Sequence, residues 1–243
     1  MSACTSIFKR EVKSYFATPI AYVFLVIFLF FSSFLTFSKG FFESREASMR
    51  LFFSNMPLLF LFLVPAISMR LWAEERRSNS IEFLFTLPVT TGQAVLAKFF
   101  AAWSVLVIAL ALTFPMVLTV SYLGKADPGP IATGYLGSVL MAGAYLAIGS
   151  FFSALSRNQV IAFILSVVAC GAFLYADSPQ AMEFVATHIS SRLANMLELI
   201  SFQTRFESIQ LGRLQLRDLA FFLLLSSGWL WATIVLLEER KGA

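Results

Sequence analysis

The sequence predicts an all-α protein that crosses a membrane six times. Only 13% of its 243 residues are charged, and the mean hydropathy is +0.80. A soluble domain carries about 25% charged residues, so this chain has too few to cover a water-facing surface. The apolar residues, among them 28 phenylalanines, gather in long uncharged stretches. Because a backbone in lipid must satisfy its own hydrogen bonds, each stretch is expected to be a helix.

Six uncharged stretches are long enough to cross about 30 Å of hydrocarbon at 1.5 Å per residue. They are residues 20–38, 51–69, 99–123, 131–155, 160–176 and 219–237. Pro57, Pro65 and Pro115 fall inside the second and third stretches and are expected to kink those helices. No small-residue cleavage site follows the first stretch, so it is predicted to be a retained span rather than a signal peptide.

An amphipathic segment precedes the first span. Over residues 7–17, Phe8, Val12 and Tyr15 share one helical face, and basic residues occupy the other positions. This pattern is typical of a helix that lies in the membrane interface. A plain charged tail is the alternative.

A longer segment, residues 177–217, separates the last two spans. Its apolar residues recur at steps of three and four through Met182, Val185, Ile189, Leu193, Met196 and Ile200. This spacing predicts an amphipathic helix that packs on the bundle or dips into the outer leaflet. Phe202, Phe206 and Ile209 continue the pattern as far as Gly212, a predicted helix stop. Asp218 is predicted to cap the start of the last span.

The charged block over residues 72–98 is the most informative part of the chain. The cluster Glu74-Glu75-Arg76-Arg77 directly follows the second span, and a short amphipathic run, 81–87, comes next. Pro88 ends this run, and Lys98 lies at the mouth of the third span. The other loops on this side are short, so the block is predicted to be the docking site of a partner protein. An ordinary interfacial loop with its charges among headgroups is the alternative.

The chain lacks residues that would drive transport or catalysis. Within the predicted boundaries no span contains Asp, Glu, Lys, Arg or His, whereas ion-coupled carriers usually bury such groups. There is no Gly-x-x-x-x-Gly-Lys-Ser/Thr phosphate loop. Glu183, His188 and Glu198 do not form a convincing catalytic set, and His188 is predicted to be an interfacial or packing residue. We therefore expect no enzyme activity, metal or cofactor in this chain. A stand-alone carrier or channel and a membrane-embedded enzyme are the competing classes.

Small residues four apart lie in the fourth span. Gly143 with Ala147, and Gly149 with Ser153, would allow close contact between helices, within the chain or at a dimer interface.

Several runs of this sequence resemble the permease subunits of type-2 class ABC transporters, and most closely those named after bacterial gliding motility. The runs are residues 9–16 with 19–22, 65–77, 81–89 with 98–99, and 202–218. Together they extend over essentially the whole chain, and the middle two are the most specific. Ser78-Asn79-Ser80 departs from the family pattern, because a Gly-Thr pair would be expected after the arginines.

The resemblance implies a single transmembrane domain over residues 1–243. It has six helices, an amino-terminal interfacial helix, and short re-entrant helices in the external segment 177–217. It also implies a coupling helix over residues 80–87, within the loop 72–98, that receives the motion of an ATPase. The docking face implied for this helix is Ile81, Phe83, Leu84 and Leu87, with Pro88 at its end. The implied polar contacts are Glu74, Glu75, Arg76, Arg77 and Glu82.

The resemblance also implies partners and a location. Two cytoplasmic ATPase subunits would hold ATP and Mg²⁺, a second permease would pair with this one, and an accessory periplasmic or membrane protein could join them. The net charge of +4 fits anionic lipid headgroups and does not require nucleic acid. The expected location is the bacterial inner membrane with both termini in the cytoplasm, although Lys and Arg give only a weak positive-inside signal. The substrate, the direction of transport, and a homodimer versus a heterodimer stay open.

Overall fold

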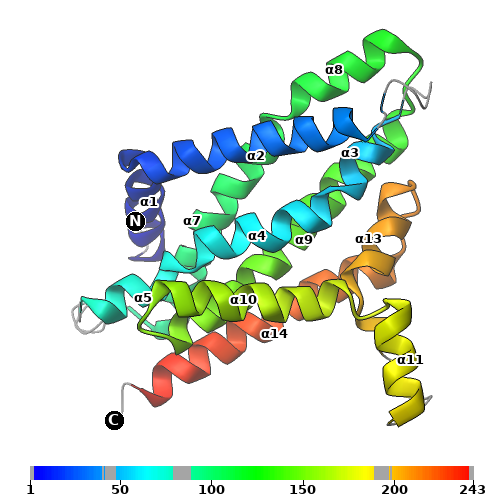
Figure 1. Ribbon diagram of the computed structural model, residues 1–243. Helices are drawn as coiled ribbons and strands as arrows, with labels where there is room; N and C mark the ends of the chain where they lie inside the picture. Colours follow the sequence, from blue (N-terminus) through cyan, green and yellow to red (C-terminus); the bar gives the residue numbers. More distant parts are fainter. Residues whose placement is uncertain are drawn as a thin grey trace.

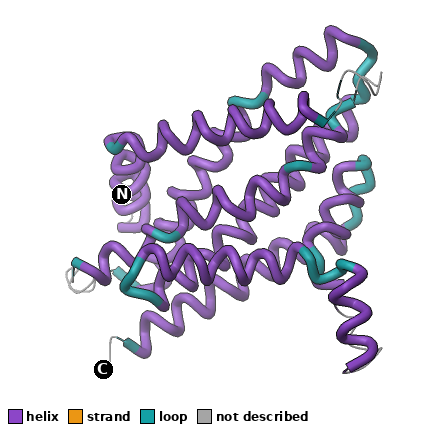
Figure 2. The backbone as a smooth tube through the Cα atoms, in the orientation of Figure 1, coloured by secondary structure: helices purple, strands orange, loops and turns teal. Residues whose placement is uncertain are grey.

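The computed structural model describes residues 3–39, 41, 48–78, 89–188, 197 and 199–240. Of these residues 86% are helical, and none lies in a strand (Figure 2). Five described helices are long and apolar enough to cross a membrane, or six if a bent pair counts as one span. The protein is therefore a multi-pass membrane protein, as its composition predicts.

The described helices have the following order along the chain. They are α1 (Ala3–Ala17), α2 (Pro19–Ser38), α3 (Arg50–Ser54), α4 (Met56–Ser68), α5 (Arg70–Arg77), α7 (Thr91–Ala111), α8 (Phe114–Leu123), α9 (Pro128–Leu155), α10 (Gln159–Leu174), α11 (Pro179–His188), α13 (Phe202–Gln210) and α14 (Leu216–Glu239). Helix α1 coincides with the predicted interfacial helix. It lies across one end of the bundle, next to the start of α2 (Figure 1).

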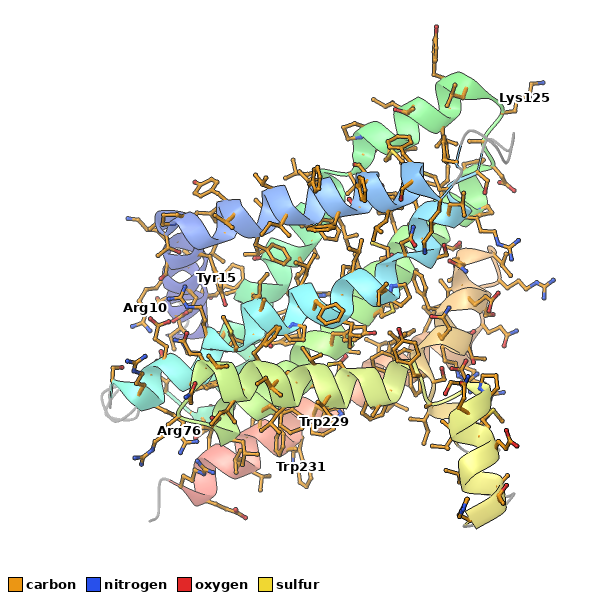
Figure 3. All side chains as sticks on the ribbon, viewed as in Figure 1. Arg10, Tyr15, Arg76, Lys125, Trp229 and Trp231 are labelled. Atoms are coloured by element: carbon orange, nitrogen blue, oxygen red, sulfur yellow. The ribbon has the colours of Figure 1, made fainter. Side chains whose placement is uncertain are left out.

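The two chain termini lie at the same end of the bundle, which we call the proximal end (Figure 1). This end also holds α1, the end of α5 and the turn between α9 and α10. The opposite, distal end holds α3, α8 and α13. Figure 3 shows Arg10, Tyr15 and Arg76 at the proximal end and Lys125 at the distal end. This arrangement agrees with an even number of crossings.

Two spans extend past the apolar stretches that predict them. The second runs over Met56–Arg77 and the third over Thr91–Leu123. The Thr90 side chain and Gln93 form a capping box, which begins α7 well before the apolar residues. Lys98, which precedes the predicted third stretch, therefore lies inside α7, where it is 3% exposed.

Helix α9 is the centre of the bundle. It contacts α4, α5, α7, α10, α13 and α14, and its second half is almost entirely buried. The small residues predicted to pack helices lie on this buried half. An added Cβ at Gly143 would lie 3.2 Å from Trp103 Nε1, and one at Gly149 would lie 2.6 Å from Ser68 Cβ. Ala147 and Ser153 are fully buried by other parts of this chain.

Gly149→Leu is expected to destabilise the protein by about 1–3 kcal/mol or more, because the side chain would force α9 away from α4. Gly228→Leu is the matched control, since nothing lies within 4 Å of a Cβ built at that position in α14. Thermal unfolding of both variants in detergent would check this. Equal melting temperatures would show that the contact between α9 and α4 tolerates a large side chain.

The distal segment differs from its prediction in two ways. The amphipathic pattern does not form one helix from 182 to 209, because Ser201 accepts hydrogen bonds from Gln203 N and Thr204 N and so begins α13 as a separate helix. Helix α10 has only 16 residues, and α11 turns away from it by 80°. Ile189, Leu193 and Met196 lie outside the described residues.

The predicted stop at Gly212 is confirmed. Gly212 has a φ of +84°, which favours glycine. Arg213 N donates to Ser208 O, as in a Schellman motif. Asp218 is not a cap, however: Gln215 is the N-cap of α14, and Asp218 lies in its first turn with its side chain buried.

Candidate functional site

The second span has a one-residue break at Met69, where α4 meets α5, and a hydroxyl from α9 stabilises this joint. Pro65 lies inside α4, and α5 starts after a break at Met69. Ser153 Oγ accepts hydrogen bonds from Trp72 N (3.0 Å) and Ala73 N (3.2 Å), and it donates one to Met69 O (2.9 Å). These amides are among the donors that the start of a helix leaves unpaired. Ser153 therefore acts as a cap for α5 that is supplied by another helix.

Two more contacts fix α5 against α9. The Trp72 indole is fully buried, and its Nε1 donates to Ser150 Oγ at 3.1 Å. The Arg76 guanidinium donates to the carbonyl oxygens of Ala154 and Leu155 at the end of α9. A cation is favourable at this position because the carboxyl end of a helix carries partial negative charge. The charged end of the second span is thus held in a defined orientation.

A buried lysine joins three helices at the proximal end. Lys98 Nζ in α7 lies 2.7 Å from Glu75 Oε1 in α5 and 3.3 Å from Glu11 Oε1 in α1. Its ammonium also lies 5.3 Å from the centre of the Trp72 ring, within range of a cation–π interaction. We call Glu11, Glu75 and Lys98 the proximal clamp. The Lys98 side chain is 4% exposed and its partners only 16% and 20%, so solvent screens these ion pairs weakly.

Helix α1 presents one face to the bundle. Ile7 is buried, and Phe8, Glu11, Val12 and Tyr15 are half-buried, whereas the basic side chains of α1 are exposed. Burial raises the pKa of the Tyr15 hydroxyl well above its usual range, and the nearby Glu11 carboxylate raises it further. Tyr15 therefore remains a neutral hydrogen-bond donor at physiological pH.

The chain matches a known protein family. A family described as "ABC-2 family transporter protein" matches residues 35–237. The chain belongs to this family. No curated protein matches the chain. Membership identifies this multi-pass chain as the membrane-embedded permease of an ABC transporter, a type of subunit that pairs with an ABC ATPase and a membrane-embedded permease. The part of the ABC transporter made by this family is the membrane component and not the catalytic domain.

The structure of this ABC-2 permease describes only part of the predicted docking site. Arg70 and Glu74 form an ion pair on α5, Glu75 belongs to the proximal clamp, and Arg77 is exposed. The remaining predicted docking residues lie outside the described residues: Ile81, Glu82, Phe83, Leu84, Leu87 and Pro88. The cluster Glu74-Glu75-Arg76-Arg77, which we call the charged collar, directly precedes this segment in the chain.

Three contributors to the site were missed by sequence reasoning. Glu11 was given no role of its own, Lys98 was expected only at the mouth of a span, and Ser153 only as a small packing residue. The available signal was the capping box at Thr90, which places Lys98 two turns inside α7 and therefore in need of a partner.

A second buried ion pair lies at the distal end. Arg205 Nη1 in α13 lies 3.1 Å from Asp218 Oδ1 in α14, and Arg205 also donates to Leu199 O. Its guanidinium lies 5.9 Å from the centre of the Phe221 ring. Asp218 is 1% exposed, so this pair attaches the distal helix α13 to the start of the last span.

The described residues offer no metal site. In the described ranges no three or more His, Cys, Asp or Glu residues are placed to hold an ion. Cys170, in α10, is buried.

Proposed function

We propose that this permease is half of the transmembrane part of a bacterial exporter. It moves its substrate across the inner membrane with ATP and Mg²⁺ bound by a separate ATPase subunit. Two ATPase subunits dock beneath a pair of permeases, which are related to the gliding-motility type. In this arrangement both termini and the proximal end face the cytoplasm.

The observation that supports this most is the attachment of α5. This helix ends in a charged collar next to residues 79–88, and it is joined to α9 by Ser153 and to α7 and α1 by Lys98. A force applied to residues 79–88 would therefore be passed to three other helices at once. We infer that residues 80–87 form a coupling helix, with Ile81, Phe83, Leu84 and Leu87 facing the ATPase and Glu82 and the collar making polar contacts.

Co-purification from the native host tests this docking. Tagged wild-type protein is expected to bring down a stoichiometric ATPase that carries a phosphate loop. The variant Ile81→Asp/Leu84→Asp is expected to lose it, because two carboxylates would be buried in an apolar interface. The matched control is Leu214→Asp/Leu216→Asp, which puts the same charges on exposed leucines at the distal end.

An ATPase that remains bound to the Ile81/Leu84 variant would move the docking site away from residues 80–87. Loss of the ATPase in the control variant as well would point to a general loss of folding. If no ATPase co-purifies with the wild-type protein in any mild detergent, the assembly proposed here is wrong.

A further inference from the structure

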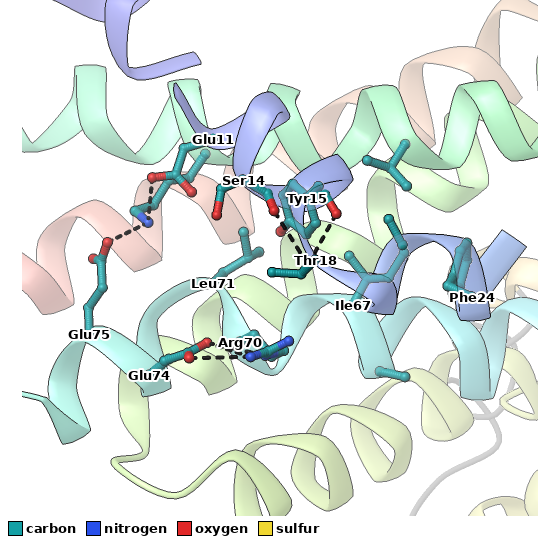
Figure 4. Close-up of a pocket in the computed structure, with 14 residues that line it drawn as sticks. Glu11, Ser14, Tyr15, Thr18, Phe24, Ile67, Arg70, Leu71, Glu74 and Glu75 are labelled. Carbon is teal, nitrogen blue, oxygen red and sulfur yellow. Dashed lines mark hydrogen bonds and ion pairs between the residues drawn. The ribbon is translucent and has the colours of Figure 1, made fainter. Parts of the chain in front are cut away.

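A cavity of about 260 Å³ opens between α1 and α2 on one side and α4, α5 and α7 on the other (Figure 4). The clamp residues and Arg70 line its charged part. Phe24, Ile67 and Val105 line its apolar part. A cavity of this kind suits an amphipathic ligand, with a polar group at one end and a hydrocarbon at the other.

The cavity lies where the membrane interface is expected. Thr18, the N-cap of α2, lines it together with Ala21 and Phe24 from the first two turns of that helix, which span about 10 Å along the helix axis. Beyond them α2 exposes large apolar side chains along its length, as a lipid-facing helix does. The cavity is therefore within reach of a lipid headgroup in the adjoining leaflet, and its apolar part lies toward the hydrocarbon.

Hydrogen-bonding groups in the lining remain available to a ligand. No described residue is hydrogen-bonded to the Tyr15 hydroxyl, and Arg70 uses only Nε and Nη2 to bind Glu74. Glu11 contacts both Arg10 and Lys98 through Oε1, which leaves Oε2 as an acceptor. The Tyr15 hydroxyl and the remaining N–H groups of Arg70 can therefore act as donors in this cavity, and Glu11 Oε2 can act as an acceptor.

The charges that line the cavity favour some lipid headgroups over others. Glu11, Glu74 and Glu75 outnumber the two cations, Arg70 and Lys98. A headgroup with only negative charge would meet this excess of carboxylates, whereas one that carries both phosphate and ammonium has a partner for each charge. The cavity volume lies below the 300–1,000 Å³ of a typical small-molecule pocket, so it suits a headgroup with its first methylenes and not a whole lipid.

We propose that this cavity binds the headgroup of one aminophospholipid from the adjoining leaflet, with phosphate at Arg70 and Tyr15 and the ammonium at Glu11. The bound lipid fills the space between α1 and α5 and stiffens the connection between the two helices. The site does not depend on an ATPase, so its test is separate from the test of the proposed function.

Native mass spectrometry of the purified chain would test this site. The protein is incubated with equal amounts of phosphatidylethanolamine and phosphatidylglycerol that have the same acyl chains. One phosphatidylethanolamine per chain is expected to stay bound preferentially. Tyr15→Phe is expected to weaken its binding about tenfold, the value of one hydrogen bond to a charged group. Ala66→Phe, which fills the cavity, is expected to abolish it.

Ala111→Phe is the matched control, since Ala111 is exposed on α7 away from the cavity. If Ala66→Phe fails to fold, the Tyr15→Phe result decides alone, because that change keeps the ring. Displacement by soluble glycerophosphoethanolamine would show that the headgroup is the recognised part, and no displacement would show that the acyl chains are required. Equal retention of both lipids, or retention that Tyr15→Phe leaves unchanged, would overturn the proposal.

Discussion

Arg205→Met is expected to lower the free energy of unfolding by about 3–5 kcal/mol, because it leaves a buried carboxylate without its cation. Asp218 is 1% exposed, and its second oxygen, Oδ2, has no hydrogen-bond partner among the described residues. The Asp218 carboxylate would therefore lose its one ion pair in the described part of the chain. Denaturant unfolding in detergent, followed by tryptophan fluorescence, would measure the effect.

The control is Arg213→Met, which removes an exposed arginine from the same distal end. The double variant Arg205→Met/Asp218→Leu is expected to recover much of the stability, since replacing both members of a buried pair by apolar residues is often neutral. If Arg205→Met were no more harmful than Arg213→Met, the ion pair would not hold α13 against α14.

Lys98→Met is expected to cost about 3 kcal/mol, because Glu11 and Glu75 would then face each other without a cation. The loss should also release α1, which Lys98 connects to the bundle through Glu11. Hydrogen exchange is the more specific measurement: the amides of α1 should exchange faster in the variant, while those in the buried centre of α9 should not.

Lys125→Met is the matched control, since it removes an exposed lysine at the distal end. Adding Glu11→Gln and Glu75→Gln to Lys98→Met is expected to restore part of the stability, because the uncompensated charges are then gone. Unchanged protection of α1 in Lys98→Met would mean that apolar contacts alone attach this helix.

Much of this fold could be predicted from local signals. The apolar stretches locate the spans because each must bury its backbone hydrogen bonds within a helix. Gly212 ends α13 because its φ of +84° suits glycine. The boundary at Ser201 was missed because the apolar spacing continues across it, so the pattern alone could not separate a cap from a helical residue.

The contacts of the proximal end could not be predicted in the same way. Lys98 pairs with a residue 87 positions earlier in the chain, and Ser153 caps a helix about 80 positions away. A single sequence records which residues can form an ion pair or a cap, but not which of them the fold brings together. The spacing of the small residues of α9 can be recognised in the sequence, but the capping role of Ser153 requires knowledge of its neighbour.

Site-specific cross-linking at Leu84 tests whether residues 80–87 contact an ATPase subunit. A photoreactive amino acid is placed at position 84 in one preparation and at the distal Leu214 in another, and both are irradiated in native membranes. We expect position 84 to cross-link to a polypeptide with a phosphate loop and position 214 not to do so. Cross-links from position 84 to lipid or to another copy of this chain alone would contradict it.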